Sequence, residues 1–169
     1  LPIMIDDRSK WIDRITNEIR RWHHVKNGID LVIIDYLQNV QCYAKDDRMR
    51  IADVTRQLKF LSLELNTCIL AVAQINREGD DRPRMKDILG SGQIEQDADL
   101  IFILHEPDET KRDGYSFQIE CNVDKNREGA KGKLAMLKYH GDTCRFHGVL
   151  DIPDSKGQDD DGDLDNSYL

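Results

Sequence analysis

Two polar residues follow strongly apolar runs in this sequence, and both are of types that can handle a bound phosphate. Asp35 follows Leu31–Ile34, and Gln74 follows the apolar run 68–73. A carboxylate at the end of a buried strand is costly without a partner, and a hydrated magnesium ion is a common partner there. A neutral amide can contact a phosphate oxygen without adding charge. The alternative interpretation is that Asp35 only caps a loop.

Two strands and a helix must position these side chains. The unbroken apolar character of Leu31–Tyr36 and of residues 68–74 predicts two strands that are covered on both faces. Between them, apolar residues recur every three or four positions, which predicts an amphipathic helix ending near Asn66. These residues are Ile51, Val54, Leu58, Leu61 and Leu65. Such a unit makes the strands parallel, so we expect Asp35 and Gln74 to face one crevice beyond their carboxyl ends.

The rest of the chain adds further elements to this unit. We predict a strand at residues 1–5, a helix that ends before Gly28, a short helix over residues 94–98 and a buried strand at Leu100–Leu104. The apolar face of the first helix consists of Ile12, Ile15, Ile19 and Trp22. Strand patterns then recur at residues 115–125, 133–139 and 143–149, which predicts an antiparallel meander.

Composition predicts one domain and an acidic tail. The chain has 169 residues, 39% of them hydrophobic, which suits a single core over residues 1–150. Its net charge is −8, but residues 151–169 hold seven aspartates against one lysine, so the domain itself is close to neutral and nucleic-acid binding is not excluded. We expect this tail to be solvated. The four scattered cysteines favour a reducing compartment, and no apolar stretch is long enough to span a membrane.

Four segments together resemble, in order and spacing, the C-terminal motor domain of the DnaB-type replicative DNA helicases of bacteria and phages. They are LVIIDYLQ, AVAQINRE, RPRMKDILGSGQIEQDADLIFIL and VDKNREGAKGKLAMLKY. The resemblance covers residues 1–148, and GSGQIEQDAD is its most specific part. It implies an α/β fold: a RecA-like, mostly parallel twisted sheet flanked by helices, with antiparallel strands at the C-terminal end.

The resemblance also implies roles for four residues at a nucleotide site between subunits. Asp35 resembles the Walker B carboxylate, which holds magnesium through water, and Gln74 resembles the sensor of the γ-phosphate. Lys125 and Arg127 resemble the basic pair that reaches a neighbouring subunit's phosphates, with Arg127 as the arginine finger. The alternative for the KNREG turn is a solvated hairpin.

The loop from Arg77 to Gly92 resembles the segment that lines the central channel and grips the backbone of single-stranded DNA. Its basic side chains would neutralise phosphates, and its small residues would let backbone N–H groups approach them. The residues concerned are Arg77, Arg82, Arg84, Lys86, Ser91 and Gly92. Three aspartates, Asp80, Asp81 and Asp87, nearly cancel this charge, and Leu89 stands where the family often has a basic residue. The alternative is a solvated loop with no ligand.

A phosphate loop is missing from the sequence. No G-x-x-x-x-G-K-[ST] motif occurs, and GSGQIE and GAKGKL do not open a helix with Lys-Ser or Lys-Thr. We therefore expect a truncated motor domain that does not hydrolyse ATP by itself. The resemblance implies that the complete protein binds ATP and Mg²⁺.

The same resemblance implies the setting of the complete protein. It would form a homo-hexamer and translocate on single-stranded DNA in the 5′–3′ sense, with primase and a helicase loader as possible further partners. The setting would be the cytoplasm of a bacterial or phage-infected cell, or an organellar matrix. The alternatives are a RecA/RadA-type recombinase-like ATPase and a non-hydrolysing module that binds DNA or protein.

Overall fold

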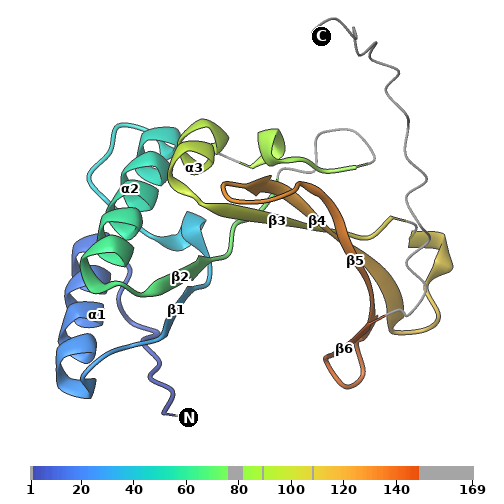
Figure 1. The fold of residues 1–169 in the computed structure, drawn as a ribbon, viewed down its shortest axis with the longest axis horizontal. Coiled ribbons are helices and arrows are strands. Elements are labelled where there is room, and N and C mark those ends of the chain that lie inside the picture. The colour runs from blue at the N-terminus through green and yellow to red at the C-terminus, as the bar shows by residue number, and fades with distance from the viewer. Residues whose placement is uncertain (1, 76–81, 89, 108, 149–169) are drawn as a thin grey trace, which may run out of the picture.

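The computed structural model describes residues 2–75, 82–88, 90–107 and 109–148. Arg77, Asp80, Asp81, Leu89 and the predicted tail at 151–169 therefore lie outside the described residues. Figure 1 labels the helices α1 (Ile12–Lys26), α2 (Asp47–Leu65) and α3 (Ser91–Asp97) and the strands β1 (Leu31–Ile34), β2 (Cys68–Ala71), β3 (Leu100–His105), β4 (Ser116–Asn126), β5 (Gly132–His140) and β6 (Arg145–Gly148). Short 3-10 turns are η1 (Leu37–Asn39), η2 (Met85–Asp87) and η3 (Glu109–Lys111).

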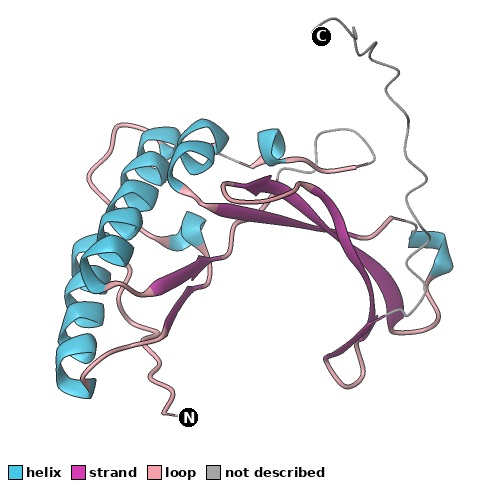
Figure 2. Cartoon of the chain, in the orientation of Figure 1, coloured by secondary structure: helices cyan, strands magenta, loops and turns pink. Residues whose placement is uncertain are grey.

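The predicted strand–helix–strand unit is present. β1 and β2 pair in parallel, with Leu31 opposite Cys68 and Ile34 opposite Ala71. α2 connects them; it begins where the side chain of Asp46 accepts a hydrogen bond from the amide of Met49 at 2.8 Å. α1 and α2 lie along the same side of this two-stranded sheet (Figures 1 and 2). The buried core between them consists of Ile12, Leu37, Val40, Ile51, Val54 and Leu58, joined by Ile88, Ile94, Ile101 and Ile103.

The predicted strand at residues 1–5 is wrong. Residues 2–5 have no regular structure, and Ile3 and Ile5 are almost fully exposed. An apolar run becomes a strand only where a neighbouring strand can accept its hydrogen bonds, and none of the described strands lies beside this segment.

The prediction that β1 and β2 are covered on both faces is also wrong for the described part of the chain. α1 and α2 cover only one face of the sheet. Large apolar side chains on the other face are exposed, with Leu31 at 48%, Ile33 at 59% and Leu70 at 47%. An apolar surface of this kind is unusual in a monomer and indicates that something else packs on it.

A second, four-stranded sheet follows, in the order β3-β4-β5-β6 with every pair antiparallel. This confirms the predicted meander, and Figure 2 shows the sheet curving away from the helices. β3 is half buried rather than fully buried, because Ile101 and Ile103 face the core while Leu100, Phe102 and Leu104 are exposed. α3 begins at Ser91, three residues before the predicted helix.

The helices and the cysteines can be compared with what the composition predicted. Over the ranges that the structure describes, none of the helices is both long enough and apolar enough to cross a bilayer. Cys42, Cys68, Cys121 and Cys144 are all free thiols. Burial raises the pKa of the Cys121 thiol, so this thiol is the less reactive kind.

Candidate functional site

Asp35 and Gln74 lie at the same edge of the parallel sheet, just beyond the carboxyl ends of β1 and β2. Backbone hydrogen bonds continue past the strands and hold this edge together: Val72 N donates to Ile34 O at 2.9 Å, and Leu37 N donates to Val72 O at 2.9 Å. The parallel pairing therefore brings the two predicted residues to one side of the domain.

The carboxylate of Asp35 is exposed and makes no hydrogen bond or ion pair with any other described residue. The Gln74 side chain is exposed as well, while its backbone is bonded to the side chain of Gln38. An exposed carboxylate and an exposed amide that follow two neighbouring parallel strands offer the oxygen ligands that Mg²⁺ and its water shell prefer. These residues fit the predicted ion.

Lys125 and Arg127 come together at a different place, the carboxyl end of α3. The ammonium of Lys125 donates to the carbonyl of Glu95 and, at 2.5 Å, to that of Ala98. The Arg127 guanidinium donates to the carbonyl of Gln96 at 3.2 Å. The last carbonyls of a helix carry partial negative charge, so both cations are well placed there. They belong to the second sheet and its turn, whereas Asp35 and Gln74 belong to the first.

Asp99, which the sequence analysis did not single out, completes this cluster. One of its carboxylate oxygens lies 2.7 Å from Arg127 Nη1, and the other lies 2.6 Å from the Lys59 ammonium of α2. The hydrogen bond from Lys59 holds the pKa of Asp99 below its usual value, and the charges of Lys59, Arg127 and Lys125 lower it further. Asp99 is therefore a charged anchor for the basic pair.

The KNREG turn is organised by Asn126. Its amide nitrogen donates to the carbonyl of Ala130 at 3.2 Å, and its amide oxygen accepts from the backbone N–H of Glu128 at 3.2 Å. A Cβ on Gly129 would lie 2.6 Å from the Asn126 nitrogen, so this position favours glycine. The turn therefore has a defined shape that presents Arg127.

The predicted DNA-contacting loop is anchored at both ends of its described part. Ile75 and Ile88 form an antiparallel bridge that closes it. The Met85 N–H donates to Asp124 of β4 at 2.7 Å, and Arg82 pairs with Glu120 of β4, a residue only 3% exposed. These contacts fasten the segment to the second sheet.

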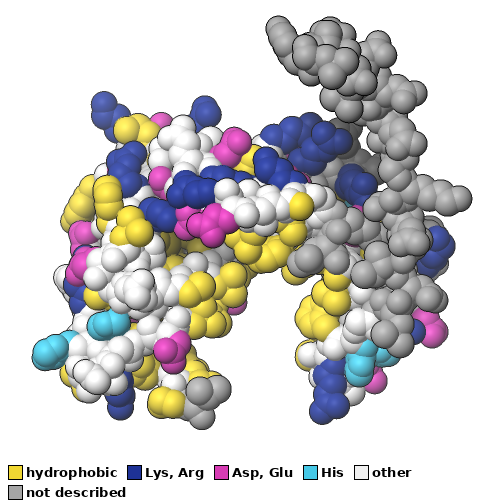
Figure 3. All heavy atoms as spheres, in the orientation of Figure 1, with side chains coloured by type: hydrophobic (Ala, Val, Ile, Leu, Met, Phe, Trp, Pro, Cys, Tyr) yellow, Lys and Arg dark blue, Asp and Glu magenta, His cyan; other side chains and the backbone are white. Residues whose placement is uncertain are grey.

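The predicted DNA-contacting side chains of this loop lie in different surroundings. Arg84 is exposed, whereas the charge of Arg82 faces Glu120. Lys86 is exposed as well. Gly92 lies in the first turn of α3 with open space where a side chain would stand. Ser91 begins the same helix, and Arg77 is not among the described residues. Figure 3 shows basic side chains gathered over α3, η2 and the β4–β5 turn.

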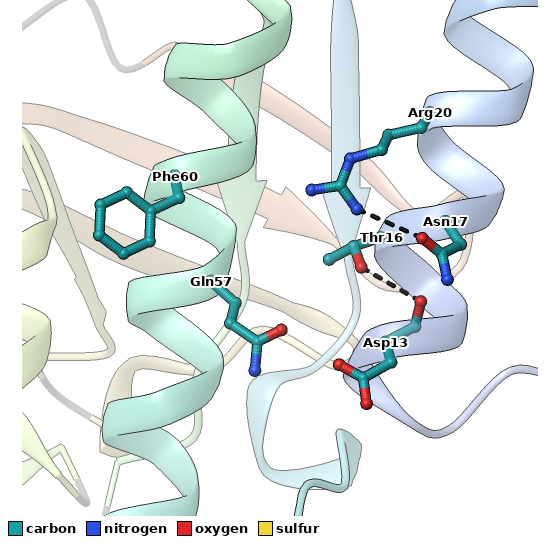
Figure 4. A pocket seen from close by; sticks show the side chains of 6 residues that line it. All are labelled: Asp13, Thr16, Asn17, Arg20, Gln57 and Phe60. Atoms are coloured by element: carbon teal, nitrogen blue, oxygen red, sulfur yellow. Dashed lines mark hydrogen bonds between the residues drawn. The ribbon is translucent and has the colours of Figure 1, made fainter.

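A cavity of about 360 Å³ lies elsewhere, in the groove between α1 and α2 (Figure 4). Its lining consists of Asp13, Thr16, Asn17, Arg20, Gln57 and Phe60. Two local bonds join lining residues: Thr16 donates to the carbonyl of Asp13 at 3.2 Å, and Arg20 donates to the Asn17 side-chain oxygen at 3.4 Å. None of the residues predicted for the site lines this cavity.

Comparison with known proteins agrees with the resemblance found in the sequence. The chain is 34% identical over 160 residues to the replicative DNA helicase DnaB of Mycoplasma genitalium, covering 86% of this chain and 34% of that protein. It is 35% identical over 147 residues to a probable plasmid replicative DNA helicase of Chlamydia psittaci, covering 83% of this chain and 32% of that protein. The chain spans about a third of the length of these curated relatives.

Solved structures support the same fold. A DnaB-like replicative helicase, solved to describe its interactions with primase, matches 81% of this chain and 36% of its own, with a TM-score of 0.69 and 30% identity. A KaiC-like protein of Pyrococcus horikoshii matches 76% of this chain and 52% of its own, with a TM-score of 0.51 and 18% identity, which bears on the fold alone. The predicted RecA-like fold is confirmed. The family model of the DnaB-like helicase C-terminal domain matches residues 1–148, and the chain belongs to this family.

Proposed function

We propose that this chain forms part of the motor of a replicative DNA helicase of the DnaB type, a ring of identical subunits that uses ATP to move along single-stranded DNA. The observation that carries the proposal is the meeting of Asp35 and Gln74 at one edge of a parallel sheet, in a chain that matches the family over residues 1–148. Membership of this family also favours the helicase over the recombinase-like alternative.

Asp35 and Gln74 serve the nucleotide in this proposal. Asp35 holds the water shell of Mg²⁺, and this ion neutralises the phosphate charge that builds up during hydrolysis. Gln74 bonds a γ-phosphate oxygen through its side-chain amide. Because Gln74 directly precedes the Ile75–Ile88 bridge, a movement at the phosphate reaches the base of the DNA loop through one peptide unit.

Lys125 and Arg127 act on the nucleotide of the neighbouring subunit. Lys125 lies near the end of β4 and Arg127 on the turn that follows it, so both belong to the second sheet, whereas Asp35 follows a strand of the first. Half of the Arg127 side chain is exposed, which leaves its guanidinium within reach of another subunit's phosphates. A planar fork of N–H donors suits phosphate oxygens.

The basic segment around η2 grips the DNA backbone. Arg84 and Lys86 are exposed on it, and Arg77, Arg82, Ser91 and Gly92 complete the proposed set. The bridge between Ile75 and Ile88 and the bond from Met85 to Asp124 give this segment a fixed base. Contacts to the phosphate backbone of this kind give affinity without sequence preference.

The phosphate loop belongs to the same ring protein but not to these residues. The exposed apolar face of β1 and β2, with Leu31, Ile33 and Leu70, is the surface on which the remainder of the nucleotide-binding domain packs. ATP and Mg²⁺ are then the cofactors of the complete protein. Its partners are single-stranded DNA, five further copies of itself and a primase, in a bacterial cytoplasm.

Mixed rings test the proposal. In a ring protein that joins this chain to a phosphate loop, Asp35→Asn and Arg127→Ala should each abolish hydrolysis while the hexamer still assembles. A ring mixed from the two variants contains interfaces that pair an intact Asp35 with an intact Arg127 of the next subunit, so hydrolysis should return. Normal turnover in Arg127→Ala rings, or mixed rings as inactive as either parent, would show that Arg127 does not act across the interface.

A further inference from the structure

The guanidinium of Arg127 is bound on its own subunit. Nη1 lies 2.7 Å from an Asp99 carboxylate oxygen, Nη2 lies 3.2 Å from the carbonyl of Gln96, and the backbone N–H of Arg127 donates to Asp99 O at 2.9 Å. The two terminal nitrogens are the donors that a phosphate would use. A phosphate that takes the planar fork of Nη1 and Nη2 therefore competes with Asp99 and Gln96 for these two nitrogens.

The ion pair between Arg127 and Asp99 is weak enough for Arg127 to exchange it for another partner. The side chains of Arg127 and Asp99 are 50% and 56% exposed, and ion pairs in such positions are weak. A triphosphate carries several negative charges, whereas Asp99 carries one. When a phosphate arrives across a subunit interface, the exchange of partners is favourable for Arg127.

Lys59 is a second partner of Asp99, and it lies on α2, the helix between the strands that Asp35 and Gln74 follow. Its ammonium lies 2.6 Å from the other Asp99 oxygen, and its side chain is only 23% exposed, so the carboxylate's charge is shared between Lys59 and Arg127. α2 is the helix that joins β1 to β2, which carry Asp35 and Gln74 at their ends. Thr55 of α2 also bonds Asp97, at 3.1 Å, and this fastens the end of α3.

We propose that Asp99 is a positioning residue that keeps Arg127 in a resting place on its own subunit, so that Arg127 engages nucleotide only when a neighbour's phosphate competes it away. The inference rests on the proposed role of Arg127 as a phosphate ligand. It implies that the Asp99–Arg127 pair restrains hydrolysis, and that Lys59 weakens this restraint by sharing the carboxylate.

The ring protein tests the inference through two variants with opposite expectations. Asp99→Asn removes the charge that holds Arg127 and should raise the DNA-free kcat by about two- to fivefold, the factor set by an exposed ion pair. Lys59→Met leaves Asp99 to Arg127 alone and should lower the DNA-free kcat. A lower or unchanged DNA-free rate in Asp99→Asn overturns the proposal, and so does a fall in both variants, which is the result expected of a purely structural cluster.

A nucleotide-free measurement separates this inference from the proposed function. In the 169-residue chain, the guanidinium NMR signals of Arg127 should show hindered rotation, which is lost in Asp99→Asn. Freely rotating signals in the unaltered chain would overturn the inference whatever the ring protein does. Hindered signals together with full turnover in Arg127→Ala rings would instead leave the Asp99 contact in place and overturn the role of Arg127.

Discussion

The side-chain amide of Gln38 bonds both backbone groups of Gln74: Gln38 Nε2 donates to Gln74 O, and Gln74 N donates to Gln38 Oε1, each at 3.2 Å. This pairing extends the β1–β2 ladder beyond the last paired strand residues, Ile34 and Ala71. It holds the proposed phosphate-sensing residue with a side chain from the segment that follows Asp35.

We expect Gln38→Ala to loosen this edge of the sheet. Two hydrogen bonds are lost, and each contributes about 1 kcal/mol net, so the free energy of unfolding should fall by at most about 2 kcal/mol. Urea denaturation of the chain measures it. Gln38→Glu is the matched variant, since it keeps an acceptor for Gln74 N but loses the donor to Gln74 O. Its free energy of unfolding should lie between those of the unaltered chain and Gln38→Ala. Equal midpoints for all three proteins would show that the pairing contributes nothing.

The local parts of this fold were predictable from the sequence, and the contacts between distant segments were not. Apolar spacing in the α1 and α2 segments and the strand–helix–strand rule predicted that Asp35 and Gln74 meet at one edge. Gln38 and Asp99 were missed because each acts through partners that only the folded chain brings near. Asn126 was missed although its partners, Glu128 and Ala130, are close in the sequence. Asp99 lies inside the quoted GSGQIEQDAD segment, so its place in that motif was the available signal.

Strand β1 and residues 2–5 show a second limit of what the sequence alone could predict. Unbroken apolar residues in β1 correctly predicted a parallel strand, but the same pattern predicted cover on both faces, and Ile33 is 59% exposed. The apolar sequence indicates a strand that is suited to burial on both faces. In the described residues, helices cover only one of these faces. Residues 2–5 failed as a strand for a related reason, since no described strand lies beside them.

Gly90 offers a sharp test of how α3 packs on α2. A Cβ at this position would lie 2.8 Å from Cγ2 of the fully buried Ile51, and its φ of +76° is one that side chains disfavour. Gly90→Ala should therefore destabilise the chain by about 2 kcal/mol or more. The measurement is the midpoint of urea denaturation.

Gly92 provides the matched control, two residues further along. It has helical neighbours and nothing within 4 Å of an added Cβ. Gly92→Ala should stabilise the chain by about 0.5–1 kcal/mol, because alanine favours the helix. If the two alanines had the same effect, the close approach of Gly90 to Ile51 would be refuted.

The Arg20–Glu64 pair should give the packing of α1 on α2 a dependence on pH. Arg20 donates to both Glu64 oxygens, at 2.8 and 2.7 Å, and this lowers the pKa of Glu64. A lowered carboxyl pKa stabilises the fold above the ordinary glutamate pKa, and the contribution is lost as the pH falls through the lowered value. Glu64→Gln should therefore lower Tm at pH 7 but not in strong acid.

A double-mutant cycle identifies the partner. In an Arg20→Met background, Glu64→Gln should change Tm equally at both pH values, because the carboxylate has lost the guanidinium that lowers its pKa. A pH-dependent difference that persists without Arg20 would assign the effect to another group.

The salt dependence of DNA binding should show which residues of the basic segment around η2 contact the phosphate backbone. Binding of a fluorescent single-stranded oligonucleotide to the chain can be followed by anisotropy, and each phosphate contact contributes about 0.7 to the slope of log K against log salt concentration. Arg84→Ala should reduce the slope by about this amount. Arg82→Ala should reduce it less, because Glu120 of β4 already faces its charge. Equal reductions for the two variants would mean that Arg82 leaves Glu120 for DNA, and an unchanged slope in both would remove this segment from the DNA-binding surface.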